Sequence, residues 1–240
     1  MPEFKLQSWH AVAPGLETLA CWRSWLEHPV PLDADLPKAA LKQIPPLMRR
    51  RFTAPGRCAA AAALPLLQEA DQVPAVFASR HGDTHLTLSL LEEVAEQQPM
   101  SPTGFSLAVH NAVSGLLSIA RKDVSEVTAI AAMDCLLPLA LLEAATRLQD
   151  HPQVLCVLYD VPLPELYRPF VSGEPFPFAL AMLLSRDEGE PISLELLSGR
   201  QQQQQGSTDD LINMMRFLCG MGDSANFPSQ TGSCWQLCRV

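Results

Sequence analysis

The stretch Met100-Ser-Pro-Thr-Gly-Phe-Ser-Leu-Ala-Val-His-Asn-Ala-Val-Ser-Gly-Leu-Leu-Ser-Ile-Ala-Arg121 combines turn chemistry with a long apolar pattern. It opens with Pro102 and Gly104, residues typical of turns. Polar side chains then recur at intervals of four, four and three, at His110, Ser114, Ser118 and Arg121. This spacing predicts a helix with one polar stripe, and a helix with so little polar surface is normally packed inside a domain. We therefore expect a turn followed by one buried helix at the centre of the fold.

Apolar segments on both sides of this stretch alternate between strand-like and helix-like patterns. Strands are predicted at 4–12, 73–79, 127–132 and 154–159, and helices at 16–26, 54–70, 86–97, 136–148 and 209–219. Two further apolar runs flank a charged segment and predict a hairpin over 178–197. This alternation predicts an α/β fold in which helices cover both faces of a mixed sheet.

Loops and domain boundaries follow from composition. The proline-rich segment 160–177 is predicted to be loop. The glutamine run at 201–205 predicts a linker that does not need to pack. We therefore expect one α/β domain over residues 1–199, followed by a linker and a C-terminal extension over 200–240 that packs on the same domain.

Charge and composition exclude several classes of function. The 240 residues carry a formal net charge of −9, which disfavours nucleic acid because phosphate binding needs a basic surface. No uninterrupted apolar run approaches the ~20 residues of a membrane span, and the N-terminal residues lack a signal-peptide pattern. We expect a cytoplasmic protein without a membrane span.

The sequence contains no recognisable metal or cofactor motif. The seven cysteines include no Cys-x-x-Cys pair, so reduced, mostly buried thiols are expected. His81, Asp83 and His85 lie close together but offer too few ligands for a metal site. No phosphate-binding glycine loop and no nucleophile elbow of the Gly-x-Ser-x-Gly type is present. We therefore predict no cofactor and no metal.

The segment Thr103-Gly-Phe-Ser-Leu-Ala-Val-His-Asn111 resembles the nucleophile turn of β-ketoacyl synthases, where a strand ends in Thr-Ala-Cys and a buried helix follows. This sequence motif is most similar to that of small ketosynthase-like subunits called chain-length factors, in particular those of aryl polyene pathways. The order of elements over 4–199 also resembles the first half of a thiolase-type ketosynthase. The resemblance implies a thiolase-like α/β fold corresponding to the ketosynthase N-terminal half.

The same resemblance implies a subunit without catalytic residues. Aligning Val109-His110-Asn111 with the family pattern places Phe105 where the family has its cysteine, as a degenerate nucleophile position. The family takes its two catalytic histidines from the second half of the fold, and no histidine follows residue 199 here.

The implied function is a non-catalytic chain-length factor. It would pair with an active β-ketoacyl synthase, as a heterodimer or a larger assembly, in polyene or fatty-acyl elongation on an acyl carrier protein. The resemblance places the following residues at the subunit interface and acyl tunnel: Ser101, Pro102, Thr103, Gly104, Phe105, Ser106, His110 and Asn111. Phe105 would then influence how long a growing chain fits. The concentrated positive charge at Arg49, Arg50 and Arg51 predicts either a solvated helix end or a contact for the carrier protein.

Two other functions remain open. A thiol-dependent acyltransferase or ketosynthase would act through Cys135, which opens a predicted helix, or through another cysteine; a helix N-terminus lowers a thiol pKa. Against this, Asp134 would raise that pKa and Leu136-Leu137 predicts burial, so a packed cysteine is the favoured interpretation. The third possibility is a free-standing module that binds an acyl chain or another small apolar ligand.

Overall fold

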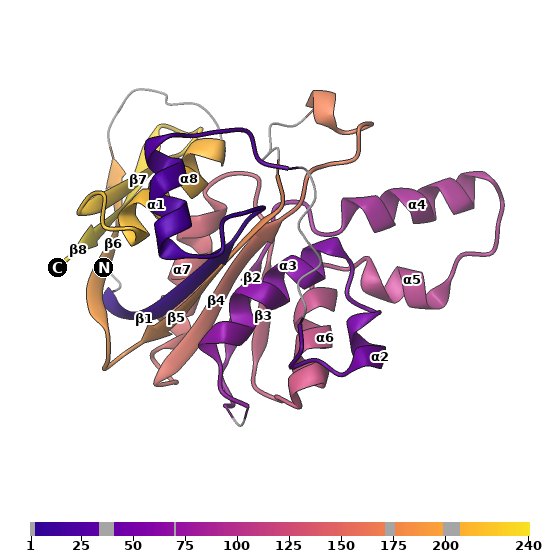
Figure 1. Cartoon of the computed structure of the whole chain (residues 1–240), viewed down its shortest axis with the longest axis horizontal. Coiled ribbons are helices and arrows are strands. Elements are labelled where there is room, and N and C mark those ends of the chain that lie inside the picture. The colour runs from indigo at the N-terminus through magenta and orange to yellow at the C-terminus, as the bar shows by residue number, and fades with distance from the viewer. Residues whose placement is uncertain (1–2, 34–40, 70, 171–175, 199–206) are drawn as a thin grey trace.

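The computed structural model describes residues 3–33, 41–69, 71–170, 176–198 and 207–240. In these residues the strands form one eight-stranded sheet with the order β3-β2-β4-β5-β1-β6-β8-β7 (Figure 1). The strands are β1 Glu3–Val12, β2 Ala75–Ala78, β3 Val127–Ile130, β4 Gln153–Asp160, β5 Phe178–Ser185, β6 Glu190–Ser198, β7 Ser224–Pro228 and β8 Ser233–Arg239. β2 pairs in parallel with β3 and β4, and the other pairs are antiparallel, so the predicted mixed sheet is confirmed.

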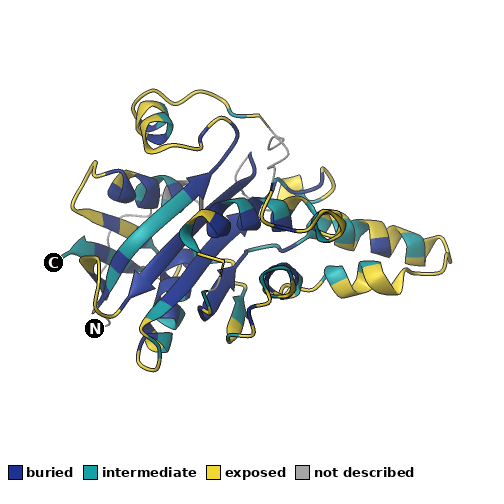
Figure 2. Cartoon of the chain, turned by 60° about the horizontal axis from the view of Figure 1, so that its bottom comes forward, coloured by how far each residue is buried: buried dark blue, intermediate teal, exposed yellow. Residues whose placement is uncertain are grey.

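Helices cover both faces of the sheet, as predicted. The α-helices are α1 Leu19–Glu27, α2 Pro46–Arg49, α3 Ala54–Ala63, α4 Thr84–Ala95, α5 Pro102–Leu107, α6 Ala112–Arg121, α7 Leu136–Arg147 and α8 Ser207–Leu218; short 3-10 turns are η1 Leu64–Leu66 and η2 Arg168–Phe170. Alternate residues of a strand point to opposite faces. In β4, Cys156 and Leu158 belong to the core formed with α1, α7 and α8, whereas Val157 and Tyr159 belong to the core formed with α3 and α6. The central strands are therefore buried on both sides (Figure 2).

The predicted hairpin over 178–197 is wrong. β5 and β6 do not pair with each other, because β1 lies between them and pairs antiparallel with both. The connection crosses β1 at Leu6, where Gly189 has φ +116 and a Cβ atom on it would collide with the Leu6 backbone. Glycine is the residue that tolerates both this φ and this close approach. The two apolar runs are thus separated in the sheet by the first strand of the chain.

The prediction of one buried helix over 100–121 is also wrong, because two helices form there. Pro102 occupies the first turn of α5, and the side chain of Ser101 accepts a hydrogen bond from the Gly104 N–H at 3.2 Å. This is the arrangement of a capped helix start, but the helix ends at Leu107. After a turn, α6 begins with Asn111 as its N-cap.

The break reverses much of the expected burial. Ser114, predicted on the polar stripe, is 3% exposed and donates to the Asn111 carbonyl at 2.9 Å. Val109 and Ile119, predicted to be interior, are 47% and 61% exposed. The apolar composition of this region therefore serves the molecular surface as well as the core.

The C-terminal part continues the same sheet. β8 pairs with β6, β7 pairs with β8, and α8 packs against α1 and β7. The predicted glutamine-rich linker lies outside the described residues, so the division into 1–199 and 200–240 stays a prediction. Among the described helices, none has the length and apolar character needed to cross a membrane.

Candidate functional site

The arrangement predicted for the central stretch occurs one strand further along the chain. β3 ends at Ile130, a sharp turn follows, and α7 begins at Leu136. Cys135 forms the end of this turn in the left-handed conformation, with φ 55 and ψ 32, and its carbonyl accepts the Leu139 N–H at 3.0 Å. A non-glycine residue in this conformation is uncommon. A strand, a strained turn and a buried helix therefore meet at Asp134 and Cys135.

The thiol at this turn is poorly suited to nucleophilic chemistry. Cys135 is 7% exposed, and burial together with the Asp134 carboxylate raises the pKa of its thiol to about 11. At pH 7 such a thiol is ionised in roughly one molecule in ten thousand, and the thiolate is the reactive form. Asp134 is held in place, since its Oδ2 accepts from Ser229 Oγ at 2.8 Å and from the Gln230 N–H at 3.1 Å. Among the described residues, no histidine acts on this thiol.

Phe105 does not stand at such a turn. It lies in α5, which follows α4 instead of a strand, and its side chain is 57% exposed. The two helices form an arm that projects from the body of the molecule (Figures 1 and 2). The prediction that Phe105 sits between a strand and a buried helix is therefore wrong in its geometry, because the Ser101 cap starts a helix directly.

The predicted interface residues lie on α5, at its N-cap and in the turn before α6, and most of them are exposed. Gly104 is half-buried because α5 packs closely on α4, where a Cβ at this glycine would lie 3.2 Å from Leu90 Cδ2. The ring of His110 lies against Gly82 at the end of β2. The others are exposed: Ser101, Pro102, Thr103, Phe105, Ser106, His110 and Asn111.

The neighbouring elements α4, α6 and β3 also expose large apolar side chains. On the arm of α4 and α5 and the turn after it, large exposed side chains are Leu91, Val94, Met100, Phe105 and Val109. Along α6, β3 and their adjoining turns, they are Ile119, Val124, Val127 and Met133. We call these nine residues the arm–edge surface; α5, which links its two parts, packs against both α4 and α6. Large exposed apolar patches mark interaction sites in soluble domains, so these side chains are candidates for one.

β3 lies at one end of the sheet beside this surface. In the described part of the chain it pairs with β2 alone, so the backbone groups on its other side have no strand partner. Such an edge can accept a strand from another chain. The arm–edge surface and β3 together form a candidate protein–protein interface.

The predicted basic cluster is only partly exposed. Arg50 and Arg51 are exposed at the end of α2, whereas Arg49 is half-buried. Arg57 fixes this corner by donating to the carbonyls of Arg49 at 3.0 Å and Phe52 at 2.9 Å. A contact between these arginines and a carrier protein stays a prediction.

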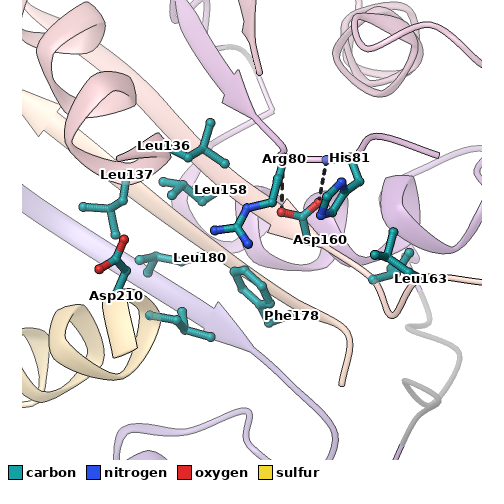
Figure 3. Close-up of a pocket in the computed structure, with 12 residues that line it drawn as sticks. Arg80, His81, Leu136, Leu137, Leu158, Asp160, Leu163, Phe178, Leu180 and Asp210 are labelled. Carbon is teal, nitrogen blue, oxygen red and sulfur yellow. Dashed lines mark hydrogen bonds between the residues drawn. The ribbon is translucent and has the colours of Figure 1, made fainter. Parts of the chain in front are cut away.

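The sequence reasoning did not identify a pocket at the C-terminal ends of β2 and β4 (Figure 3). Asp160, at the end of β4, accepts hydrogen bonds from Ser79 Oγ at 2.8 Å, the Arg80 N–H at 3.0 Å and the His81 N–H at 3.3 Å. Burial raises the pKa of Asp160 in spite of these bonds, and it lowers the pKa of His81. The available signal was a polar residue directly after each buried strand, since the C-terminal ends of neighbouring parallel strands meet at one edge.

This architecture is that of one half of a thiolase-like ketosynthase fold, with exposed apolar side chains beside an edge strand and a buried thiol at the turn before α7. A family model described as "Beta-ketoacyl synthase, N-terminal domain" matches residues 22–235, and the chain belongs to this family. The predicted family and fold are thereby confirmed.

Comparison with solved structures gives the same fold. The chain is similar, with a TM-score of 0.83 and 26% identity, to a chain in the structure of a ketosynthase (ApeO) in complex with its chain length factor (ApeC) from Xenorhabdus doucetiae; the match covers 98% of this chain and 99% of that one. The ishigamide ketosynthase/chain length factor gives a TM-score of 0.65 at 14% identity, covering 81% of this chain and 67% of that chain. A β-ketoacyl synthase from Burkholderia phymatum gives 0.62 at 11%, covering 93% and 71%. These last two similarities show the fold alone. A search of curated proteins gives no match.

Proposed function

We propose that the chain is a non-catalytic chain length factor that pairs with an active β-ketoacyl synthase. Its setting would be fatty-acyl or polyene elongation, of the aryl polyene type, on an acyl carrier protein in the cytoplasm. The observation that carries this proposal is the turn between β3 and α7, a strand–turn–helix arrangement that resembles the family's nucleophile turn. Its thiol, Cys135, is 7% exposed, and burial raises its pKa to about 11. A subunit with this turn has no evident way to carry an acyl group by itself.

The arm–edge surface supports the pairing. It exposes apolar side chains beside an open strand edge, a combination that a second ketosynthase-like subunit could cover. The similar solved structure at 26% identity is a complex of a ketosynthase with its chain length factor, and the matched chain there is of almost the same length as this one. Phe105, exposed on the arm, would face that partner and contribute to the wall of its acyl tunnel.

Co-expression and co-purification with a β-ketoacyl synthase from the same organism test the proposal. We expect a 1:1 complex by native mass spectrometry. Val127→Lys places a charge on the open edge of β3 and should reduce complex formation by about ten-fold. Val30→Lys is the matched control, since Val30 is 60% exposed and lies outside the arm–edge surface. Equal loss of complex in both variants, or no complex with the unmodified chain, would count against this interface.

The alternative enzyme function is separated by intact mass. Incubation with acyl- or malonyl-loaded carrier protein should leave the mass of this chain unchanged. A stable acyl adduct that disappears in Cys135→Ser would establish a thiol-dependent acyltransferase or ketosynthase instead.

A further inference from the structure

The pocket at the ends of β2 and β4 has no role in the pairing proposed above. The pocket is open to solvent, and the empty space within it, counted out to its mouth and including solvent-exposed volume, is about 670 Å³. Its apolar wall consists of Leu136, Leu137, Leu158, Val161, Leu163, Phe178, Leu180 and Leu211. These residues come from α7, α8, β4, β5 and the loop after β4 (Figure 3). The walls therefore suit a hydrocarbon group.

Arg80 brings a permanent positive charge into these apolar walls. Asp160 holds the main chain on both sides of it, through the N–H groups of Arg80 and His81 and through Ser79 Oγ. From this fixed backbone the guanidinium extends into the pocket beside Leu158 and Leu180 (Figure 3). A guanidinium offers five N–H donors in a planar fork, so it can bind a carboxylate while keeping its contacts within the protein.

The pocket contains two acidic residues, Asp160 and Asp210, which lie at different walls. Both oxygens of Asp160 already accept hydrogen bonds from the 79–81 segment. Asp210 lies on α8 at the other wall, beside Leu137 (Figure 3). The wall around it is apolar, so a second carboxylate at that end of the ligand would have to leave water for leucine side chains, which costs free energy.

We propose that this pocket binds a small apolar monocarboxylate, with the hydrocarbon part among the leucines and the carboxylate on Arg80. The inference concerns this chain's own residues and does not depend on the proposed pairing with a ketosynthase.

Calorimetric titration with three eight-carbon probes tests the ligand class. Octanoate should bind about ten-fold more tightly than octan-1-ol, which lacks the charge, and than octanedioate, which adds a second one. Arg80→Gln should weaken octanoate by about ten-fold and change octanol binding by less than about three-fold. Octanol or octanedioate binding as tightly as octanoate would overturn the assignment of a monocarboxylate.

A pair of substitutions on α7 tests the location. Leu136 and Leu139 are both half-buried on the same helix, but only Leu136 lines the pocket. Leu136→Trp should fill the pocket and abolish octanoate binding, whereas Leu139→Trp should preserve it within about two-fold. Thermal unfolding of both variants checks that each is folded.

The titration uses the chain as it purifies, alone or with its ketosynthase. In a complex, variants made only in this chain isolate its own contribution, because the partner is unchanged. Absence of octanoate binding, or binding unaffected by both Arg80→Gln and Leu136→Trp, would overturn the pocket proposal without touching the pairing experiment. Failure to form a complex would likewise leave the titration valid.

Discussion

Removing the carboxylate of Asp160 is the sharpest test of how the pocket end of the sheet is held together. Asp160 joins β4 to the loop after β2, 81 residues away in the sequence, through three hydrogen bonds. Oδ1 accepts from Ser79 Oγ and the His81 N–H, and Oδ2 accepts from the Arg80 N–H. Asp160→Ala leaves both main-chain donors without this acceptor.

The magnitude follows from that count. An unsatisfied buried donor costs about 1–3 kcal/mol, so the loss of two in Asp160→Ala should lower the free energy of unfolding by roughly 2–6 kcal/mol. Asp160→Asn keeps one acceptor oxygen, and its NH₂ group faces one of the two main-chain N–H groups in either orientation. One donor is then lost, and neutralising a group whose pKa is raised by burial returns part of the loss. We expect about 1–2 kcal/mol for Asp160→Asn.

Urea unfolding at pH 7, followed by circular dichroism, measures these differences. The slope of the free energy against urea should be unchanged, so that the midpoint alone reports stability. An Asp160→Ala variant as stable as the unmodified chain, or an Asp160→Asn variant less stable than Asp160→Ala, would refute the reasoning.

The pH dependence of stability gives a second comparison between the unmodified chain and Asp160→Asn. Because the folded protein raises the pKa of Asp160, it binds this proton more tightly than the unfolded chain does. The stabilisation from this group is complete below the ordinary value of 3.8 and is lost as pH rises through the raised folded value. The free energy of unfolding of the unmodified chain, relative to that of Asp160→Asn, should therefore fall as pH increases from 3.8 through the raised folded pKa of Asp160.

Three further outcomes follow from the structure. Phe105→Ala should leave the complex assembled, because it removes one exposed ring, but should change the length of the products in reconstituted synthesis; identical products would remove Phe105 from the tunnel. Cys135 should be alkylated by iodoacetamide more slowly than the half-exposed Cys21 at pH 7.5, and faster as pH rises toward its value of about 11, as read by peptide mass spectrometry. Gly189→Ala should lower the free energy of unfolding by more than about 2 kcal/mol, because its φ of +116 and its approach to the Leu6 backbone both exclude a Cβ; a smaller change in urea unfolding would contradict the packing of β1 between β5 and β6.

The strands were predictable because their apolar runs are short, bounded and buried on both faces. β4 was predicted at 154–159 and found at Gln153–Asp160. Which strands become neighbours was not predictable, since a strand buried on both faces has the same continuous apolar sequence pattern whichever strand it pairs with. The placement of β1 between β5 and β6 depends on contacts across almost the whole chain.

The candidate site was only partly predictable for a related reason. The sequence motif at 100–111 correctly indicated the family. It did not reveal where the chain forms the strand–turn–helix arrangement that resembles the family's nucleophile turn. That turn requires a strand before it, and the strand is β3, which ends at Ile130. Nothing in the apolar pattern of 100–121 marks the helix break before Asn111, because neither proline nor glycine stands there.

The exposed apolar side chains are better explained by binding than by folding. The sheet is covered on one face by α1, α7 and α8 and on the other by α3 and α6, so its core does not need the arm of α4 and α5. Yet this arm and the neighbouring edge expose Phe105, Ile119 and Val127 to 57%, 61% and 40%. Natural edge strands are commonly kept short or charged to prevent association. β3 is short, at four residues, but the exposed side chains on it and on its adjoining turns, Val124, Val127 and Met133, are apolar. Apolar side chains beside a short open edge favour one specific partner over indiscriminate pairing, as the proposed pairing with a ketosynthase requires.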